Sequence, residues 1–166
     1  MQTQKQETLK SKIKKIKLNH FPAFRRTGGR IIFLSDDWKE IHVRLDLNYF
    51  TKNYVGSVFG GSIYGALDPI YMVQLVKILG NDYVVWDKSA EIYFIKPIKQ
   101  RVVAKFIIEN TVIEEIKNQI RLKDKETFQF KTALIDDNGK AYAEVVKNIY
   151  VANKSYYLNK INGFNK

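Results

Sequence analysis

The chain has 166 residues, of which 45% are hydrophobic and 27% charged, so it is long enough for one folded domain and too short for two full cores. It contains no cysteine, which excludes disulfides, thiolate metal sites and a cysteine nucleophile. The formal net charge is +11, but residues 1–26 alone hold six Lys and two Arg against one Glu. Because the rest of the chain is only mildly basic, we do not expect a nucleic-acid partner.

Apolar runs in the sequence are short. None approaches the roughly 18 residues that a membrane-spanning helix needs. The lysine-rich N-terminus is not followed by the continuous apolar core of a secretory signal. We therefore expect a cytoplasmic protein.

The first predicted element is an amphipathic helix over residues 6–19. Leu9, Ile13 and Ile16 recur at spacings of four and three residues, with lysines at the other positions. We expect this apolar stripe to cover part of the domain. The alternative interpretation is a basic interfacial helix on a membrane surface.

Two short strands and one long helix follow. The strands are predicted at Arg30–Leu34 and 40–47, the second from its alternation of apolar and polar residues. A polar loop at 48–57 leads to a helix at 61–79. This helix is apolar on every side rather than along one stripe, so it should be buried all round.

From residue 83 onward the pattern predicts only strands and then a polar tail. The strands are expected at 83–95, 101–113, 127–135 and 140–151, and the tail at 155–166. Asn138 and Gly139 predict a tight hairpin between the last two strands. This order of elements predicts an α+β fold in which a curved antiparallel sheet encloses a single helix.

Asp68 stands in the middle of the apolar helix, where a carboxylate needs a partner or a chemical role. Tyr64 and two glycines, Gly61 and Gly65, share its helix face, and the glycines would leave room for a ligand. Pro69 removes the N–H that would pair with the carbonyl of Gly65, so the helix should bend here. Alternatively, Asp68 accepts a hydrogen bond at the bend or caps a second helix that starts at Pro69.

Gly60 and Gly61 lie where this helix begins. Their free amides, backed by the helix dipole, suit a carbonyl oxygen that acquires negative charge. Together with Asp68 two turns later, they predict a small active site for acyl transfer to water.

These residues resemble the hotdog-fold thioesterases, in particular the phenylacetate-type acyl-CoA thioesterases. The pattern Asn-x2-Gly-x2-His-Gly-Gly-x6-Asp/Glu of that family is matched by Asn53, Gly56, Phe59, Gly60, Gly61 and Asp68. Residues 85–97 resemble the strand of that fold that ends in proline. The combination of Phe-Gly-Gly, Asp-Pro and Trp-Asp-Lys is most similar to an uncharacterised branch, known as a domain of unknown function.

The resemblance spans about residues 30–152 and implies the hotdog fold, with a long central helix wrapped by a curved antiparallel sheet. The expected organisation is a basic N-terminal helix and connector at 1–26, the hotdog domain at 27–154, and the polar tail. Members of the family are dimers or dimers of dimers, with the active site at a subunit boundary. We expect the same of this chain.

The resemblance also assigns roles to residues. Asp68 would activate the attacking water or attack the thioester itself, while the Gly61 N–H and the Asn53 side-chain amide polarise the carbonyl. Asp87 or Ser89, which alternation puts on one face of their strand, would orient the water from the partner chain. The other expected substrate contacts are Gly60, Phe59, Tyr64 and Gly65 along the helix, and Lys96, Lys99 and Arg101 for the CoA phosphates.

We expect no cofactor and no metal, because the acyl-CoA is itself the substrate. One residue departs from the family pattern: Phe59 stands where the family has His and cannot transfer a proton. This favours an alternative function, a non-catalytic binder of acyl ligands, and argues against the hotdog dehydratases, which need a catalytic His. A third possibility is an interaction module that acts through the basic N-terminal helix.

Overall fold

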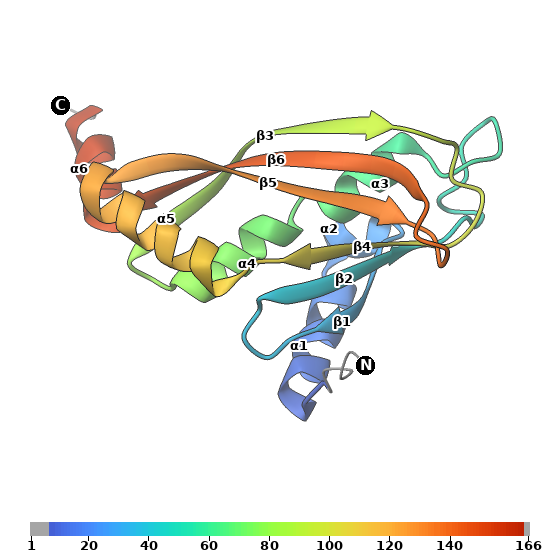
Figure 1. Ribbon diagram of the computed structural model, residues 1–166, viewed down its shortest axis with the longest axis horizontal. Coiled ribbons are helices and arrows are strands. Elements are labelled where there is room, and N and C mark those ends of the chain that lie inside the picture. Colours follow the sequence, from blue (N-terminus) through green and yellow to red (C-terminus); the bar gives the residue numbers. More distant parts are fainter. Residues whose placement is uncertain (1–6, 165–166) are drawn as a thin grey trace.

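The computed structural model describes residues 7–164, and within them the chain forms a six-stranded antiparallel sheet that curves around two short helices (Figure 1). The strand order is β1-β2-β4-β5-β6-β3. The strands are β1 Arg30–Leu34, β2 Glu40–Leu45, β3 Tyr83–Phe94, β4 Val102–Ile107, β5 Lys125–Ile135 and β6 Ala141–Asn153. The helices are α1 Leu9–His20, α2 Pro22–Arg26, α3 Gly60–Leu67, α4 Ile70–Leu79, α5 Asn110–Lys123 and α6 Lys154–Phe164. The predicted α+β class and curved antiparallel sheet are confirmed.

The core lies between the concave face of the sheet and the helices α3 and α4. Leu67 and Leu75 are fully buried there. The Tyr71 ring packs against Phe106 and Phe130, and its hydroxyl donates to the carbonyl oxygen of Lys131. Alternating apolar residues of the strands supply the other wall of this core, as a half-buried sheet requires.

The predicted central helix is interrupted at Pro69, so it forms two helices rather than one. Backbone bonds continue on both sides, from the Asp68 N–H to Tyr64 and from the Val73 N–H to Pro69. The expectation that this helix is buried all round is wrong for the face that carries Tyr64, whose side chain is 46% exposed. No described residue covers this side chain fully.

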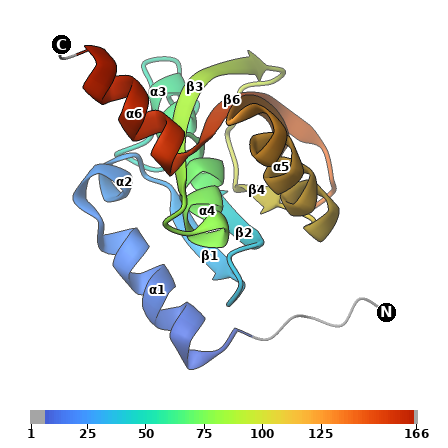
Figure 2. The ribbon, with the colours of Figure 1, turned by 90° about the vertical axis from the view of Figure 1, so that its left-hand side faces the viewer.

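Two helices, α5 and α6, were not predicted from the sequence pattern. The strand expected at 101–113 ends at Ile107, and α5 follows, with Ile113, Ile116 and Ile120 buried at helical spacing. The tail expected at 155–166 is a helix over its described part, α6, and the Asn153 side chain accepts a hydrogen bond from the Ser155 N–H at its start. Both helices lie at the same end of the sheet (Figure 2).

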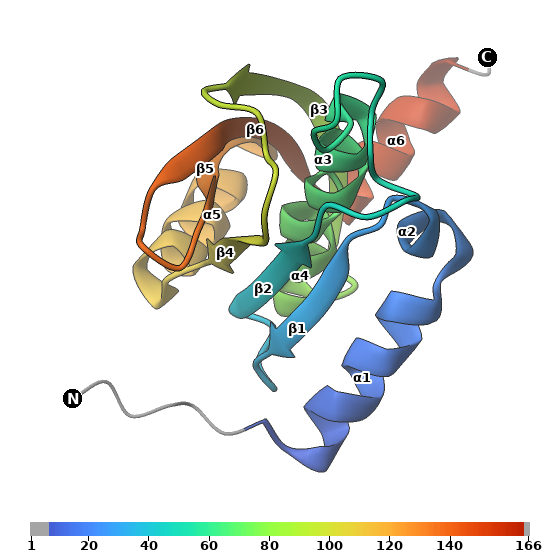
Figure 3. The same ribbon diagram turned by 90° about the vertical axis from the view of Figure 1, so that its right-hand side faces the viewer.

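The N-terminal helix runs from Leu9 to His20, and Gln6, the first residue of the predicted span, lies outside the described residues. The expectation that its apolar stripe covers the domain is wrong. Ser11, not the stripe, is the buried residue of α1. The helix runs alongside β1 at the edge of the sheet (Figure 3) and contacts that strand with its polar side. No helix in the described part of the chain is long and apolar enough to cross a membrane.

Candidate active site

A buried lysine on β6 is the partner of Asp68. The Lys147 side chain is 1% exposed, and its Nζ donates a hydrogen bond of 2.6 Å to Asp68 Oδ1. The same Nζ lies 2.8 Å from Oδ1 of Asp87 on β3. We call Asp68, Lys147 and Asp87 the Asp–Lys–Asp cluster. A buried ammonium that lacked such partners would be strongly unfavourable, so the cluster fixes the helix break onto the sheet.

Lys147 reaches Asp68 because its side chain points from β6 toward the core. Ala143, Val145, Ile149 and Val151 alternate into the core on this strand, and Lys147 occupies the middle position of the same series. Sequence reasoning missed this residue. The signal was a lysine at an inward position of an otherwise apolar alternation, where a charged side chain requires a buried partner.

The two carboxylates of the cluster differ in their surroundings. Burial raises the pKa of Asp87 above its usual value, although Lys147 opposes this shift. Its buried Oδ1 accepts no well-formed hydrogen bond in the described part of the chain, so its contact with Lys147 is an ion pair only. Asp68 accepts a true hydrogen bond and keeps its side chain 33% exposed. Asp68 is therefore the more exposed of the two carboxylates, since the Asp87 side chain is 24% exposed.

The aspartates of the cluster also shift the pKa values of Lys147 and Tyr64. Burial alone would lower the pKa of Lys147, but its interactions with the two aspartates raise the pKa above the usual value. Lys147 is therefore an ammonium at neutral pH. Desolvation and the nearby Asp68 carboxylate raise the pKa of the Tyr64 phenol, so Tyr64 keeps its proton beside Asp68.

Asp87 and Ser89 do not share a face of β3, and the expectation that they do is wrong. A β-bulge shifts the register between them, so Asp87 pairs with buried Ile149 whereas Ser89 pairs with Asn148. The Ser89 hydroxyl accepts a hydrogen bond from the Asn148 side chain on the outer face. Within one chain, the bulge thus turns Asp87 toward Lys147 and Ser89 away from it.

The helix α3 begins at Gly60, with Phe59 as its N-cap residue and without a side-chain cap. No described residue accepts a hydrogen bond from the N–H of Gly60 or Gly61. Both amides thus remain donors at the positive end of the helix dipole.

The space beside Gly61 and Gly65 of α3 is already filled. A Cβ on Gly61 would lie 2.3 Å from Cε1 of Phe59, and a Cβ on Gly65 would lie 2.9 Å from Cγ2 of Thr27. The glycines therefore admit the chain's own side chains, rather than leaving the open slot that the sequence predicted.

Asn53 uses its side chain inside its own loop. Its Oδ1 accepts hydrogen bonds from the N–H groups of Val55 and Ser57, and its Nδ2 donates to the Ser57 hydroxyl at 2.9 Å. The side-chain amide expected to polarise a carbonyl is thus engaged in a loop that it stabilises.

A pocket of about 410 Å³ opens at the N-terminus of α3, and Asp68 does not line it. The lining residues are Asn53, Ser57, Val58, Gly60, Ile63, Phe94, Ile95, Lys96, Pro97 and Ile98. The structure therefore brings Asn53, Gly60 and Lys96 together, and it separates them from the Asp–Lys–Asp cluster.

The three basic candidates differ in their surroundings. Lys96 lies at the pocket, where contact with the Lys140 side chain lowers its pKa below the usual value. Arg101 is engaged elsewhere, with its Nε 2.9 Å from Asp46 Oδ1. Lys99 is exposed.

The comparisons with known proteins give one family and one fold. The family model that matches residues 10–151 is described as a domain of unknown function, DUF4442. No curated protein matches the sequence significantly.

Solved structures share the fold at low sequence identity. A protein of unknown function from Pseudomonas aeruginosa, described as a probable thioesterase, is 16% identical, with a TM-score of 0.74 over 86% of this chain and 95% of its own. A protein of unknown function from Chlorobaculum tepidum is 17% identical, with a TM-score of 0.67 over 86% and 93%. A thioesterase from Haemophilus influenzae is 12% identical, with a TM-score of 0.63 over 89% and 93%. The predicted hotdog fold is thereby confirmed.

Proposed function

Because the chain belongs to the DUF4442 family and has the hotdog fold of thioesterases, we propose that it hydrolyses a hydrophobic acyl thioester with Asp68 as the reacting carboxylate. The observation that carries this proposal is the Asp–Lys–Asp cluster. It holds one oxygen of Asp68 at 2.6 Å from a buried ammonium while a third of the side chain stays exposed.

Asp68 would act either as a general base or as a nucleophile. A carboxylate that is fixed through one oxygen can present the other to a water molecule or to the thioester carbon. Lys147 touches no substrate in this proposal and is a positioning residue. The amides of Gly60 and Gly61 would stabilise the negative charge on the carbonyl oxygen, as helix N-termini do for anions.

The carrier of the acyl group is proposed to be CoA. Lys96 and Lys140 are crowded together beside the pocket, which is why the pKa of Lys96 is lowered. A phosphate between them would relieve this repulsion, since opposite charges offset like charges at short range. Lys99 is exposed nearby in the sequence and adds to the positive charge.

We further propose a homodimer that forms through β3. This strand is an edge of the sheet and is twelve residues long, with Trp86, Tyr93 and Phe94 more than half exposed. Long, uncovered edge strands readily pair with another chain. The loop before α3 adds Tyr49 and Phe50, both nearly fully exposed. A partner at this edge would cover the Asp68 side of α3.

The test is hydrolysis of acyl-CoA substrates of increasing chain length by the full-length protein and by Asp68→Asn. We expect turnover by the wild type and a loss of about 10²-fold or more in the variant, the range attributed to general acid–base catalysis. Ser89→Ala is the matched control on the outer face of β3 and should retain activity. Equal rates for wild type and Asp68→Asn, with both proteins folded, would remove Asp68 from the mechanism.

A second function is favoured by Phe59 and Asn53. Phe59 stands where the family has His, and the Asn53 side-chain amide, one of the predicted carbonyl contacts, is engaged in its own loop. A non-catalytic acyl-CoA binder would need neither that His nor a free amide. It predicts that calorimetry detects acyl-CoA binding while the thioester stays intact.

A further inference from the structure

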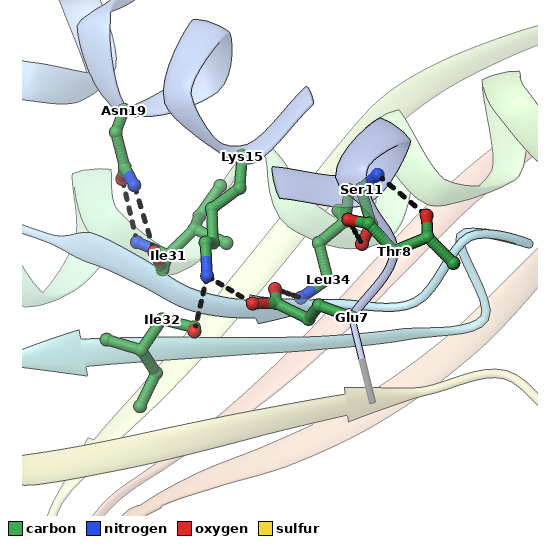
Figure 4. Close-up of polar contacts among 8 residues, drawn as sticks. All are labelled: Glu7, Thr8, Ser11, Lys15, Asn19, Ile31, Ile32 and Leu34. Atoms are coloured by element: carbon green, nitrogen blue, oxygen red, sulfur yellow. Dashed lines mark hydrogen bonds and ion pairs between the residues drawn. The ribbon is translucent and has the colours of Figure 1, made fainter. Parts of the chain in front are cut away.

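One face of α1 forms hydrogen bonds with the edge strand of the sheet. Side chains of the helix and of the residue before its N-cap replace the missing neighbour strand of β1 by bonding to its backbone (Figure 4). Asn19 both donates to the carbonyl oxygen and accepts from the N–H of Ile31, at 2.9 and 2.8 Å. The other bonds run from Lys15 Nζ to the Ile32 carbonyl oxygen and from the Leu34 N–H to the Glu7 carboxylate.

The opposite face of α1 carries the apolar stripe. Leu9, Ile13 and Ile16 are 74%, 46% and 56% exposed. Ser11, on the side that faces the domain, is fully buried. Because residues three and four apart share one helix face, the three aliphatic side chains form one continuous stripe directed away from the protein.

Basic residues border this stripe on both sides. Lys10, Lys12 and Lys17 are exposed and form no ion pair within the described residues. Residues 8–26 contain no Asp or Glu, and Arg25 and Arg26 extend the positive charge into α2. An apolar stripe between lysines is typical of helices that lie in the headgroup region of anionic bilayers, where the lysine stems reach along the stripe.

We propose that α1 is a docking surface for an anionic lipid bilayer, with the stripe inserted among the headgroups and the lysines at the lipid phosphates. A protein partner fits less well, because stable protein interfaces bury about 800 Å² per partner and are depleted in lysine at their centre. With only three aliphatic side chains, the binding should be reversible and sensitive to salt. The proposal stands independently of the thioesterase activity.

The experiment is sedimentation of the full-length protein with vesicles of phosphatidylcholine alone or with added phosphatidylglycerol, at low and at high salt. Wild type should bind only the anionic vesicles and dissociate at high salt. The stripe variant Leu9→Gln/Ile16→Gln and the charge variant Lys10→Gln/Lys17→Gln should each lower the partition coefficient about tenfold. The matched controls are Leu122→Gln, an exposed leucine of α5, and Lys105→Gln/Lys131→Gln, two exposed lysines of the sheet.

The controls should bind within about twofold of the wild type if location rather than total charge decides the partition. Helix content by circular dichroism shows whether a variant keeps α1. The proposal is overturned if the wild type ignores anionic vesicles, or if the controls lose as much binding as the α1 variants. It is also overturned if ultracentrifugation shows that the stripe variant dissociates an oligomer while vesicles remain unbound, because a second copy then covers the stripe.

Discussion

At the break between α3 and α4, Asp68 is held by a buried ammonium, whereas at the start of α3 the chain's own Phe59 ring lies against Gly61. The first region is fixed by hydrogen bonding and charge between three elements of the fold. The second region is shaped by an aromatic side chain that is 56% exposed. The carboxylate is thus positioned by three elements of the fold, whereas the start of α3 is bordered by a single, partly exposed aromatic side chain.

This difference separates two requirements of thioester hydrolysis. In the proposed reaction, activation of water needs a carboxylate in a constant position, and the Asp–Lys–Asp cluster holds Asp68 in this way. Stabilisation of the carbonyl oxygen needs donors that the substrate can reach. The following changes test each region separately.

Removal of the ammonium should have the largest effect. Lys147→Met leaves Asp87 and the bonded oxygen of Asp68 without a cation, so we expect a loss of about 3 kcal/mol in the free energy of unfolding. Urea denaturation measures it. Lys105→Met, at an exposed lysine of β4, should cost no more than about 0.5 kcal/mol. A loss at Lys147 that is as small as at Lys105 would show that the cluster does not fix the helix break.

The contribution of Lys147 to stability should also depend on pH in a defined direction. Its pKa in the folded state is raised above the usual 10.5, so its stabilisation is complete below that value and is lost as the pH rises through the raised pKa. The difference in unfolding free energy between wild type and Lys147→Met should therefore shrink at alkaline pH. A difference that grows above the usual pKa would contradict the sign of this shift.

The smallest effect is expected at the second region, the start of α3. Phe59→Ala removes the ring that lies against Gly61 and should raise the rate of acyl-CoA hydrolysis by up to about tenfold, because a substrate carbonyl would then meet less obstruction at the start of α3. Steady-state kinetics measure this change, and Ile107→Ala, a half-exposed residue of β4, serves as the control. An unchanged rate would mean that the Phe59 ring does not limit access to the amide.

Much of the fold could be predicted because it rests on local patterns. The strands predicted at 40–47, 83–95 and 140–151 lie within a few residues of β2, β3 and β6, and the Asn138–Gly139 pair marked a hairpin whose Gly139 has a φ of +77°. The helix α5 was missed because its isoleucines extend the apolar run of β4, which hides the change of period at Ile108.

The site was harder to predict, because its parts come from distant segments. Asp68 was identified from its apolar surroundings, but Lys147 lies 79 residues further along the chain and only the sheet brings it close. The stripe of α1 was predicted correctly as a pattern and wrongly as a contact. The polar side of the helix contacts the domain instead, because it forms hydrogen bonds with backbone groups at the β1 edge that would otherwise lack partners.

The measurement that tests Asp68 most directly is the single-turnover rate constant for pre-bound acyl-CoA in wild type and Asp68→Asn, with the affinity of each determined by calorimetry. Pre-binding removes any contribution from weaker association. We predict similar affinities and a rate constant that falls by about 10²-fold or more in the variant. An unchanged rate constant in a folded Asp68→Asn protein would contradict the catalytic role of the carboxylate.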